Sequence, residues 1–366
     1  MKKYKNKKII IATGGTGGHV FPAYSLAKYL QKNSFSIEVI TDERGLRFLK
    51  RYKELRLILN NSSTIFKKNF FSIFLSVCLI TYSFLKSLFI LRKSKPYLVF
   101  GMGGYSSFPV CMAARFLGIP FIIYENNLVI GKSNKFLLPF AYKIFLAYSE
   151  LEGILKKYTH KKVTTGNLLR EEILNFKKRK KKSKEKRLNI LILGGSQAAK
   201  SFGDTLPGIL NKCSKEGLKI QVFQQCIVGQ EKKIKGEYNS TNIKCRLFNF
   251  SKNITEYFSK VDFVITRSGS SIISELLNCN IPFVSIPYPY AADNHQEKNG
   301  IYFKNKGYSF LLKENEVKSK LFPLIKLIYK DKEILKRIIN NQKKYSDKNV
   351  FKKIKSEIEK LINDKN

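Results

Sequence analysis

With 366 residues, 43% of them hydrophobic, the chain is too apolar to be disordered, and its length predicts two folded domains. Its net charge of +41 suits nucleic acid or an anionic membrane surface, but a compositional drift toward Lys codons would produce the same excess. The six cysteines are widely spaced without a C-x-x-C pair, which argues against a zinc site or a disulfide framework and fits a reducing cytosol.

The N-terminal residues predict a strand rather than a secretion signal. A basic start is followed by only a short apolar run, residues 8–12, before the glycines. That run is too short for the hydrophobic region of a signal peptide. We therefore expect a protein that is not secreted.

Three glycine-rich turns each follow a short apolar run of strand type. The turns are residues 13–19, 101–105 and 194–197, after apolar runs at 8–12, 97–100 and 188–193. Glycine permits positive φ and close approach to a ligand, and a helix that follows presents N–H groups and partial positive charge to an anion. The turns therefore predict binding of phosphate carried on a nucleotide.

Residues 70–91 form a long apolar segment whose only charge is Lys86, and its length approaches that of a membrane span. On a helix of about 100° per residue, its serines and Lys86 form one stripe away from the large apolar side chains. Basic residues bracket the segment: Lys67, Lys68, Arg92, Lys93 and Lys95. Docking on an anionic membrane surface is the favoured interpretation, with ordinary core packing and a true span as alternatives.

The repeat of strand, glycine turn and helix near residues 8 and 188 predicts two α/β lobes of the Rossmann-like, doubly wound type. We expect an N-terminal lobe over residues 1–165, a C-terminal lobe over 166–342, and a final helix over about 343–366 that packs back on the first lobe. The basic run 177–187 is predicted to be solvated and mobile. Further predictions are strands at 261–266 and 281–287 and surface helix over 333–362.

Several motifs occur in a fixed order along the chain. They are GGTGGHVFP at 14–22, GMGGY at 101–105, GGSQ at 194–197, RSG at 267–269 leading to Glu275, and DNHQ at 293–296. One glycine turn is weakly specific, but the ordered set, from about residue 8 to residue 300, is highly specific. It closely resembles the MurG family, the peripheral membrane N-acetylglucosaminyltransferases of bacterial peptidoglycan synthesis.

The resemblance implies a GT-B fold, in which the two lobes face a central cleft. It implies an inverting transfer of N-acetylglucosamine from UDP-N-acetylglucosamine to the 4-hydroxyl of undecaprenyl-pyrophosphoryl-N-acetylmuramyl-pentapeptide. It also implies no metal and no cofactor, and the sequence has no Asp-x-Asp motif; helix N-termini would then stabilise the leaving UDP. The expected location is the cytoplasmic face of the bacterial membrane, as a peripheral protein, with no nucleic-acid partner.

The resemblance also implies site residues in both lobes. His19 and Glu125 are rival general bases, although His19 could instead bind the acceptor pyrophosphate. The other acceptor-side candidates are Thr16, Gly17, Gly18, Tyr105 and Asn127. The donor-side candidates are Arg170, Ser196 for the diphosphate, Ser251 beside the uracil, Glu275 for the ribose hydroxyls, and Gln296 for the sugar hydroxyls.

Four positions depart from the family pattern. Tyr124 stands where the family has histidine, Asn126 where it has glutamine, Leu168 where it has proline, and Ala198 where it has glycine. Without proline, φ at Leu168 is not fixed, so we expect a less rigid hinge and a less constrained Arg170.

Two other functions remain as alternatives. A UDP-N-acetylglucosamine 2-epimerase would share the architecture, but it needs neither the apolar segment 70–91 nor the turn at 101–105. A non-catalytic basic protein that binds nucleic acid or membrane would explain the charge, but it would leave the glycine turns, Glu275 and Gln296 without a purpose.

Overall fold

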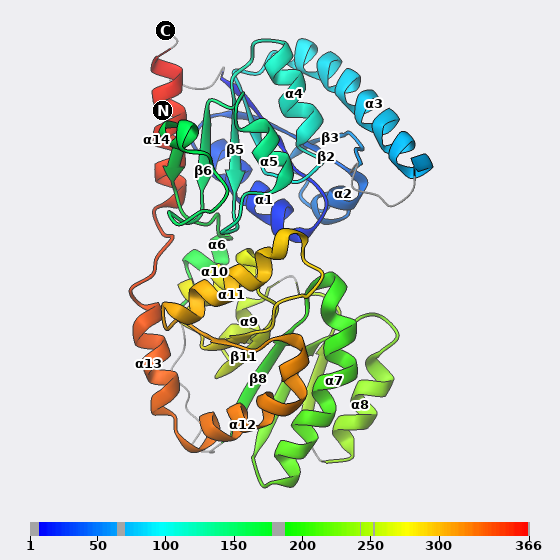
Figure 1. The fold of residues 1–366 in the computed structure, drawn as a ribbon, viewed down its shortest axis with the longest axis vertical. Coiled ribbons are helices and arrows are strands. Elements are labelled where there is room, and N and C mark those ends of the chain that lie inside the picture. The colour runs from blue at the N-terminus through cyan, green and yellow to red at the C-terminus, as the bar shows by residue number, and fades with distance from the viewer. Residues whose placement is uncertain (1–6, 64–69, 178–186, 242, 252, 365–366) are drawn as a thin grey trace. The chain divides into compact units, whose positions relative to one another are not determined.

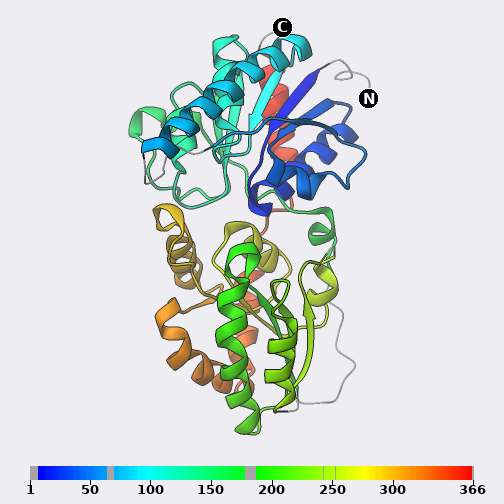
Figure 2. The ribbon, with the colours of Figure 1, turned by 90° about the vertical axis from the view of Figure 1, so that its right-hand side faces the viewer.

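The computed structural model describes residues 7–63, 70–177, 187–241, 243–251 and 253–364, and the chain divides into two compact units. Unit 1 comprises Met1–Arg170 and Asp347–Asn366, and unit 2 comprises Glu171–Ser346. Each unit is built around a parallel sheet covered by helices (Figures 1 and 2). The predicted fold class of two doubly wound α/β lobes is confirmed. The basic run at 177–187 lies almost wholly outside the described residues.

Unit 1 has a seven-stranded sheet in the order β3-β2-β1-β4-β5-β6-β7. The strands are β1 (Lys8–Ala12), β2 (Ser36–Thr41), β3 (Arg56–Leu59), β4 (Leu98–Gly101), β5 (Phe121–Glu125), β6 (Lys143–Leu146) and β7 (Lys162–Thr164). The central strands are continuous apolar runs because helices cover both faces of a parallel sheet. In β1, for example, Ile9, Ile10 and Ile11 are fully buried.

The helices of unit 1 are α1 (Gly17–Lys32), α2 (Glu43–Leu49), α3 (Phe70–Ser94), α4 (Phe108–Phe116), α5 (Lys132–Leu137), α14 (Val350–Asn363) and the 3-10 helix Lys156–Lys161. The last of the α-helices returns from the far end of the sequence. The ring of Phe351 stacks on Tyr29 at 5.0 Å, and Tyr97 donates a hydrogen bond to the carbonyl of Ile362. The prediction of one helix over 333–362 is wrong, because residues 343–349 separate α13 (Glu333–Gln342) from α14.

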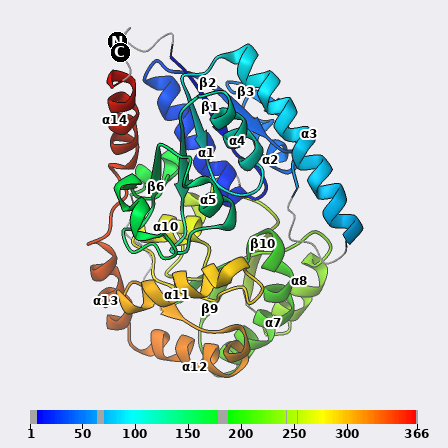
Figure 3. The same cartoon turned by 45° about the horizontal axis from the view of Figure 1, so that its top comes forward.

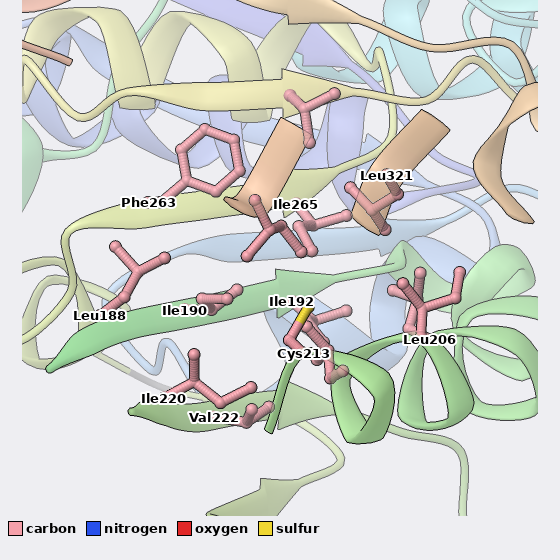
Figure 4. Close-up of a cluster of buried hydrophobic side chains, with 14 of the residues drawn as sticks. Leu188, Ile190, Ile192, Leu206, Cys213, Ile220, Val222, Phe263, Ile265 and Leu321 are labelled. Atoms are coloured by element: carbon pink, nitrogen blue, oxygen red, sulfur yellow. The ribbon is translucent and has the colours of Figure 1, made fainter. Parts of the chain in front are cut away.

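Unit 2 has a six-stranded sheet in the order β10-β9-β8-β11-β12-β13. Its strands are β8 (Leu188–Leu193), β9 (Ile220–Gln225), β10 (Lys244–Phe248), β11 (Phe263–Thr266), β12 (Phe283–Ser285) and β13 (Phe310–Leu311). Its helices are α6 (Glu171–Leu174), α7 (Gly195–Lys215), α8 (Glu231–Asn239), α9 (Thr255–Phe258), α10 (Ser270–Asn278), α11 (His295–Asn305), α12 (Val317–Lys330), α13 (Glu333–Gln342) and the 3-10 turns Ala292–Asn294 and Glu314–Glu316. Figure 4 shows one side of its core, where β8, β9 and β11 pack against Leu206 and Cys213 of α7 and Leu321 of α12.

Both sheets contain a switch point, where the chain stops adding strands on one side and begins on the other. In unit 1 it lies between β1 and β4, and in unit 2 between β8 and β11. Ligands of doubly wound proteins bind at the carboxyl ends of the strands that flank such a point. The turns at residues 13–16 and 102–105 follow β1 and β4, and those at 194 and 267–269 follow β8 and β11. Each unit therefore brings one pair of motifs together.

Helix α3 presents its serine stripe to the protein and many of its large apolar side chains to solvent, while Leu91 is buried and Phe84 and Leu88 pack partly against the core. Ser76, Ser83 and Ser87 are fully buried, and Asn60 donates hydrogen bonds to the Ser83 carbonyl and the Ser87 hydroxyl. Within the described residues it is the single helix long and apolar enough to cross a membrane, yet only 17% of its apolar window is buried. Ordinary core packing of the apolar face is therefore wrong.

Candidate functional site

His19 joins the two glycine turns of unit 1. It lies in the first turn of α1, and its Nδ1 is 3.0 Å from the carbonyl oxygen of Met102, just beyond β4. A carbonyl only accepts, so Nδ1 carries the proton and Nε2 is the basic nitrogen. Gly104 has φ of +74°, and a Cβ there would lie 3.7 Å from Nε2. The second turn therefore passes directly beside the imidazole.

Glu125, the last residue of β5, organises the loop that follows it. The carboxylate is 4% exposed. Oε1 accepts from the backbone and side-chain amides of Asn127 at 3.1 and 3.2 Å, and Oε2 accepts from Gly131 N and Asn134 Nδ2 at 2.9 and 3.0 Å. Each carboxylate oxygen is already engaged by two hydrogen-bond donors. The geometry thus gives Glu125 the task of holding Asn127.

Thr16, Gly17 and Gly18 form the N-terminus of α1. Thr16 occupies the N-cap position and is exposed, and its hydroxyl makes no capping hydrogen bond to the helix. Asn126 donates to the carbonyl of Gly18 at 3.4 Å, which links this turn to the loop after β5. The three segments of unit 1 that carry the predicted acceptor-side residues, the two glycine turns and the loop after β5, are therefore neighbours.

Asp42, which the sequence did not single out, contacts both glycine turns of unit 1. It follows β2, is 4% exposed, and accepts hydrogen bonds from Gly15 N, Gly45 N and Ser106 Oγ at 2.8–2.9 Å. Tyr105 Oη lies 3.3 Å from the same carboxylate. The sequence feature that could have indicated this residue is its place, as an acid at the carboxyl end of the strand next to the switch point.

Arg170 ends the first segment of unit 1. It is half-buried, and its guanidinium lies 5.7 Å from the centre of the Phe21 ring on α1. The backbone before it is fixed, because Asn167 N donates to Asp347 Oδ1 at 3.0 Å.

The first glycine turn of unit 2 is held by Gln225, another residue that the sequence analysis missed. Gly195 N donates to Gln225 Oε1 at 3.2 Å, and Gln225 Nε2 donates to the carbonyl of Asn249 at the same distance. These bonds connect the start of α7 to the ends of β9 and β10. Ser251 lies half-buried in the loop after β10. Ser196 falls outside the residues whose side chains are described.

Glu275 and Gln296 lie on the helices that follow β11 and β12. Glu275, on α10, is 9% exposed. Gln296, on α11, accepts a hydrogen bond from Tyr288 N through its Oε1 at 2.9 Å. That bond fixes the amide so that its NH₂ group, a double donor, points away from the Tyr288 backbone.

A buried cation supports the loop that carries Tyr288. Arg267 is 5% exposed and donates to the carbonyls of Ile286 and Pro287, both at 3.3 Å, and to the carboxylate of Glu314. Although burial acts to raise it, the pKa of Glu314 is lowered by hydrogen bonds from Arg267 and Ser201 and by the Arg267 charge. The pair therefore stays ionised at neutral pH.

Comparison with known proteins supports the motif assignment. The glycosyltransferase family 28 N-terminal domain matches residues 9–146, and the family 28 C-terminal domain matches residues 189–358. The chain is also 35% identical, over 98% of its length and 99% of the relative's, to a Pelagibacter ubique UDP-N-acetylglucosamine--N-acetylmuramyl-(pentapeptide) pyrophosphoryl-undecaprenol N-acetylglucosamine transferase. The chain belongs to the MurG family of glycosyltransferase family 28.

Solved structures agree with the fold of the MurG family. The crystal structure of Acinetobacter baumannii MurG matches with a TM-score of 0.76 at 24% identity, covering 97% of this chain and 99% of that one. A Neisseria meningitidis UDP-GlcNAc 2-epimerase matches with a TM-score of 0.66 at 15% identity, covering 96% and 100%. At such identities these likenesses establish the two-lobed fold alone, so the family assignment depends on the sequence matches.

Proposed function

We propose that this MurG-family protein transfers N-acetylglucosamine from UDP-N-acetylglucosamine to the 4-hydroxyl of undecaprenyl-pyrophosphoryl-N-acetylmuramyl-pentapeptide. The observation that carries the proposal is the nearly full-length match to a relative named for this reaction, together with the paired motifs at both switch points. The acceptor oxygen bonds to the anomeric carbon as the bond from that carbon to UDP breaks. The leaving electron pair goes to the β-phosphate oxygen, and configuration inverts from α to β.

His19 is the general base of the proposed reaction. The Met102 carbonyl holds the proton on Nδ1, so Nε2 accepts the proton of the acceptor hydroxyl as the new bond forms. Glu125 is the weaker candidate because both its oxygens already accept two hydrogen bonds each. Its contribution is to position Asn127, while Thr16, Gly17, Gly18 and Tyr105 contact the acceptor.

Unit 2 supplies the donor contacts. Glu275 offers two acceptor oxygens to the vicinal ribose hydroxyls, and Gln296 offers its oriented NH₂ group to the sugar. The diphosphate binds at the N-terminus of the 21-residue helix α7, which includes Ser196, and the helix dipole stabilises the charge that develops on UDP. Ser251 lies beside the base. Arg170, which belongs to unit 1, stays a donor-binding candidate through the family resemblance alone.

The exposed face of α3 is the proposed membrane contact. Phe71 and Phe89 are each 70% exposed and Phe74 is 57% exposed. The apolar surface continues onto α4, where Phe116 is 70% exposed and packs edge-on against Phe84 of α3. Figure 3 shows α3 lying along the outside of unit 1, with α4 beside it. The inward polar stripe leaves this face available to lipid.

Charge at the end of α3 suits an anionic membrane. Arg92, Lys93 and Lys95 are all exposed, and each basic residue near an anionic surface contributes about 1 kcal/mol. Each large apolar side chain transferred from water adds at most about 1.5–3 kcal/mol. We therefore place the protein at the cytoplasmic face of the bacterial membrane, bound peripherally and close to its lipid-linked acceptor.

The stereochemistry of the product tests the proposed reaction. With a competent lipid-linked acceptor, NMR of the product should show a β linkage, and no epimerised UDP-sugar should form without the acceptor. His19→Gln should lower kcat by about a hundredfold or more, in the range of a general-base contribution, with the donor KM little changed. A product that retains the α configuration would refute single displacement.

A further inference from the structure

We propose that Asp42 is a positioning residue that locks the two glycine turns of unit 1 together and sets the acceptor-side contacts. The inference rests on the proposed transferase function and extends it to a residue outside every motif of the sequence analysis. Asp42 is not itself a contact to substrate. It acts through Gly15, Ser106 and Tyr105.

Burial makes the contacts of Asp42 obligatory. The side chain is 4% exposed, and an ionised carboxylate in such a place is costly unless hydrogen bonds satisfy it. Oδ1 accepts from Gly15 N at 2.9 Å and Gly45 N at 2.8 Å, and Oδ2 accepts from Ser106 Oγ at 2.9 Å. The turn after β1, the turn after β4 and the start of α2 thus share one anion.

Helix capping explains only one of these bonds. Asp42 is the N-cap of α2, and the bond from Gly45 N satisfies that role. The bonds from Gly15 and Ser106 come from residues 27 and 64 positions away in the chain. A serine would cap α2 equally well, but it has one short hydroxyl and cannot reach both turns. The cross-link therefore requires a carboxylate.

The two glycine turns of unit 1 are closely packed at this carboxylate. A Cβ on Gly14 would lie 2.5 Å from Ser106 Oγ and 2.7 Å from Asp42 Oδ1. Gly15, with φ of +76°, directs its N–H at Asp42 rather than outward. This N–H consequently holds the two turns together and does not bind the acceptor diphosphate.

The same carboxylate sets two outward-facing side chains. Tyr105 Oη lies 3.3 Å from Oδ2, and Arg44 Nε lies 3.8 Å from it, with the guanidinium 5.0 Å from the centre of the Tyr105 ring. Arg44 is 52% exposed. A Cβ on Gly15 would lie 3.7 Å from Arg44 and 3.9 Å from Tyr105. Asp42 thereby places a cation and a hydroxyl next to each other beside the first turn.

The test compares Asp42→Ser with Ser106→Ala and with the control Glu43→Ser. Glu43 is an exposed acid at the start of the same helix, so its change alters the charge but not the cross-link. We expect Asp42→Ser to speed amide hydrogen exchange in peptides covering residues 13–19 and 102–108, while α2 keeps its protection. Ser106→Ala should give a smaller change in the same peptides, and Glu43→Ser none.

Steady-state kinetics distinguishes a positioning role of Asp42 from a simple effect of its negative charge. Removing an acid near a diphosphate should tighten acceptor binding if charge alone matters. Positioning instead predicts that Asp42→Ser lowers kcat/KM for the lipid acceptor about tenfold and leaves KM for UDP-N-acetylglucosamine unchanged. Exchange changes confined to residues 43–50, or an unchanged or improved acceptor kcat/KM with an active wild type, would overturn the inference. A wild type that does not turn over refutes the proposed function, and the exchange comparison then decides the role of Asp42.

Discussion

The backbone N–H of Leu168 donates a hydrogen bond of 3.1 Å to Tyr124 Oη, and this hydroxyl donates in turn to the carbonyl of Gly166, also at 3.1 Å. These residues stand at two of the positions where the sequence departs from the family pattern. A proline at 168 would have no N–H to donate. The two departures therefore compensate each other, because the tyrosine hydroxyl restrains a segment that a proline ring would otherwise stiffen.

This pair predicts coupled effects on stability. Burial raises the pKa of Tyr124 well above its usual value, so the hydroxyl remains a donor across the ordinary pH range. Tyr124→Phe leaves the buried N–H of Leu168 without its partner, which should cost about 1–3 kcal/mol in the free energy of unfolding. Leu168→Pro removes the N–H itself. Chemical denaturation of both single variants and the double variant measures the coupling.

This double-mutant cycle measures whether the two positions stabilise the protein through each other. Leu168→Pro should cost less in the Tyr124→Phe background than in the wild type, with a coupling of about 1 kcal/mol. Additive effects would show that the two positions act independently.

The positions of the motifs could be predicted from the sequence, whereas their partners could not. The strands at 8–12 and 188–193 and the positive φ of Gly15, Gly104 and Gly195 follow from local chemistry. Asp42 and Gln225 were missed because their role depends on parallel strands that are neighbours only in the sheet. Likewise, periodicity revealed the two faces of residues 70–91 but not which face turns inward.

Acidification should weaken the support that Arg267 gives to unit 2. The pKa of Glu314 is lowered relative to its usual 4.5, so its pair with Arg267 contributes stability above that pH and loses it as pH falls through the lowered pKa. Glu314→Gln should therefore destabilise the protein by about 1–3 kcal/mol near neutral pH, less than a fully buried pair because Glu314 is partly exposed.

Denaturation at several pH values checks this prediction. The difference between wild type and Glu314→Gln should be constant between about pH 6 and 7 and shrink below about pH 4.5. Glu333→Gln, which breaks an exposed pair with Lys336, should change stability little. A difference that persists in acid would show that charge at Glu314 is not what stabilises the loop.

Membrane binding should depend on the exposed face of α3. Phe74→Glu combined with Phe89→Glu replaces two exposed apolar side chains by acids, which should lower partition onto vesicles containing anionic phosphatidylglycerol by at least about tenfold. Leu327→Glu, at a 51% exposed position on α12, is the matched control and should bind like the wild type. Vesicle binding of all three proteins is measured by cosedimentation. If the control lost as much binding as the α3 variant, α3 would not be the membrane contact.

The most direct test of the central claim is UDP release from UDP-N-acetylglucosamine, measured with and without lipid-linked muramyl-pentapeptide, for wild type and Glu275→Ala. Glu275 is a nearly buried carboxylate on α10, and losing its bonds to the ribose should raise the donor KM by about tenfold or more. We expect release that requires the acceptor and falls sharply in the variant. Release that proceeds equally without acceptor, or no turnover with a competent acceptor, would contradict the assignment of this protein as the transferase.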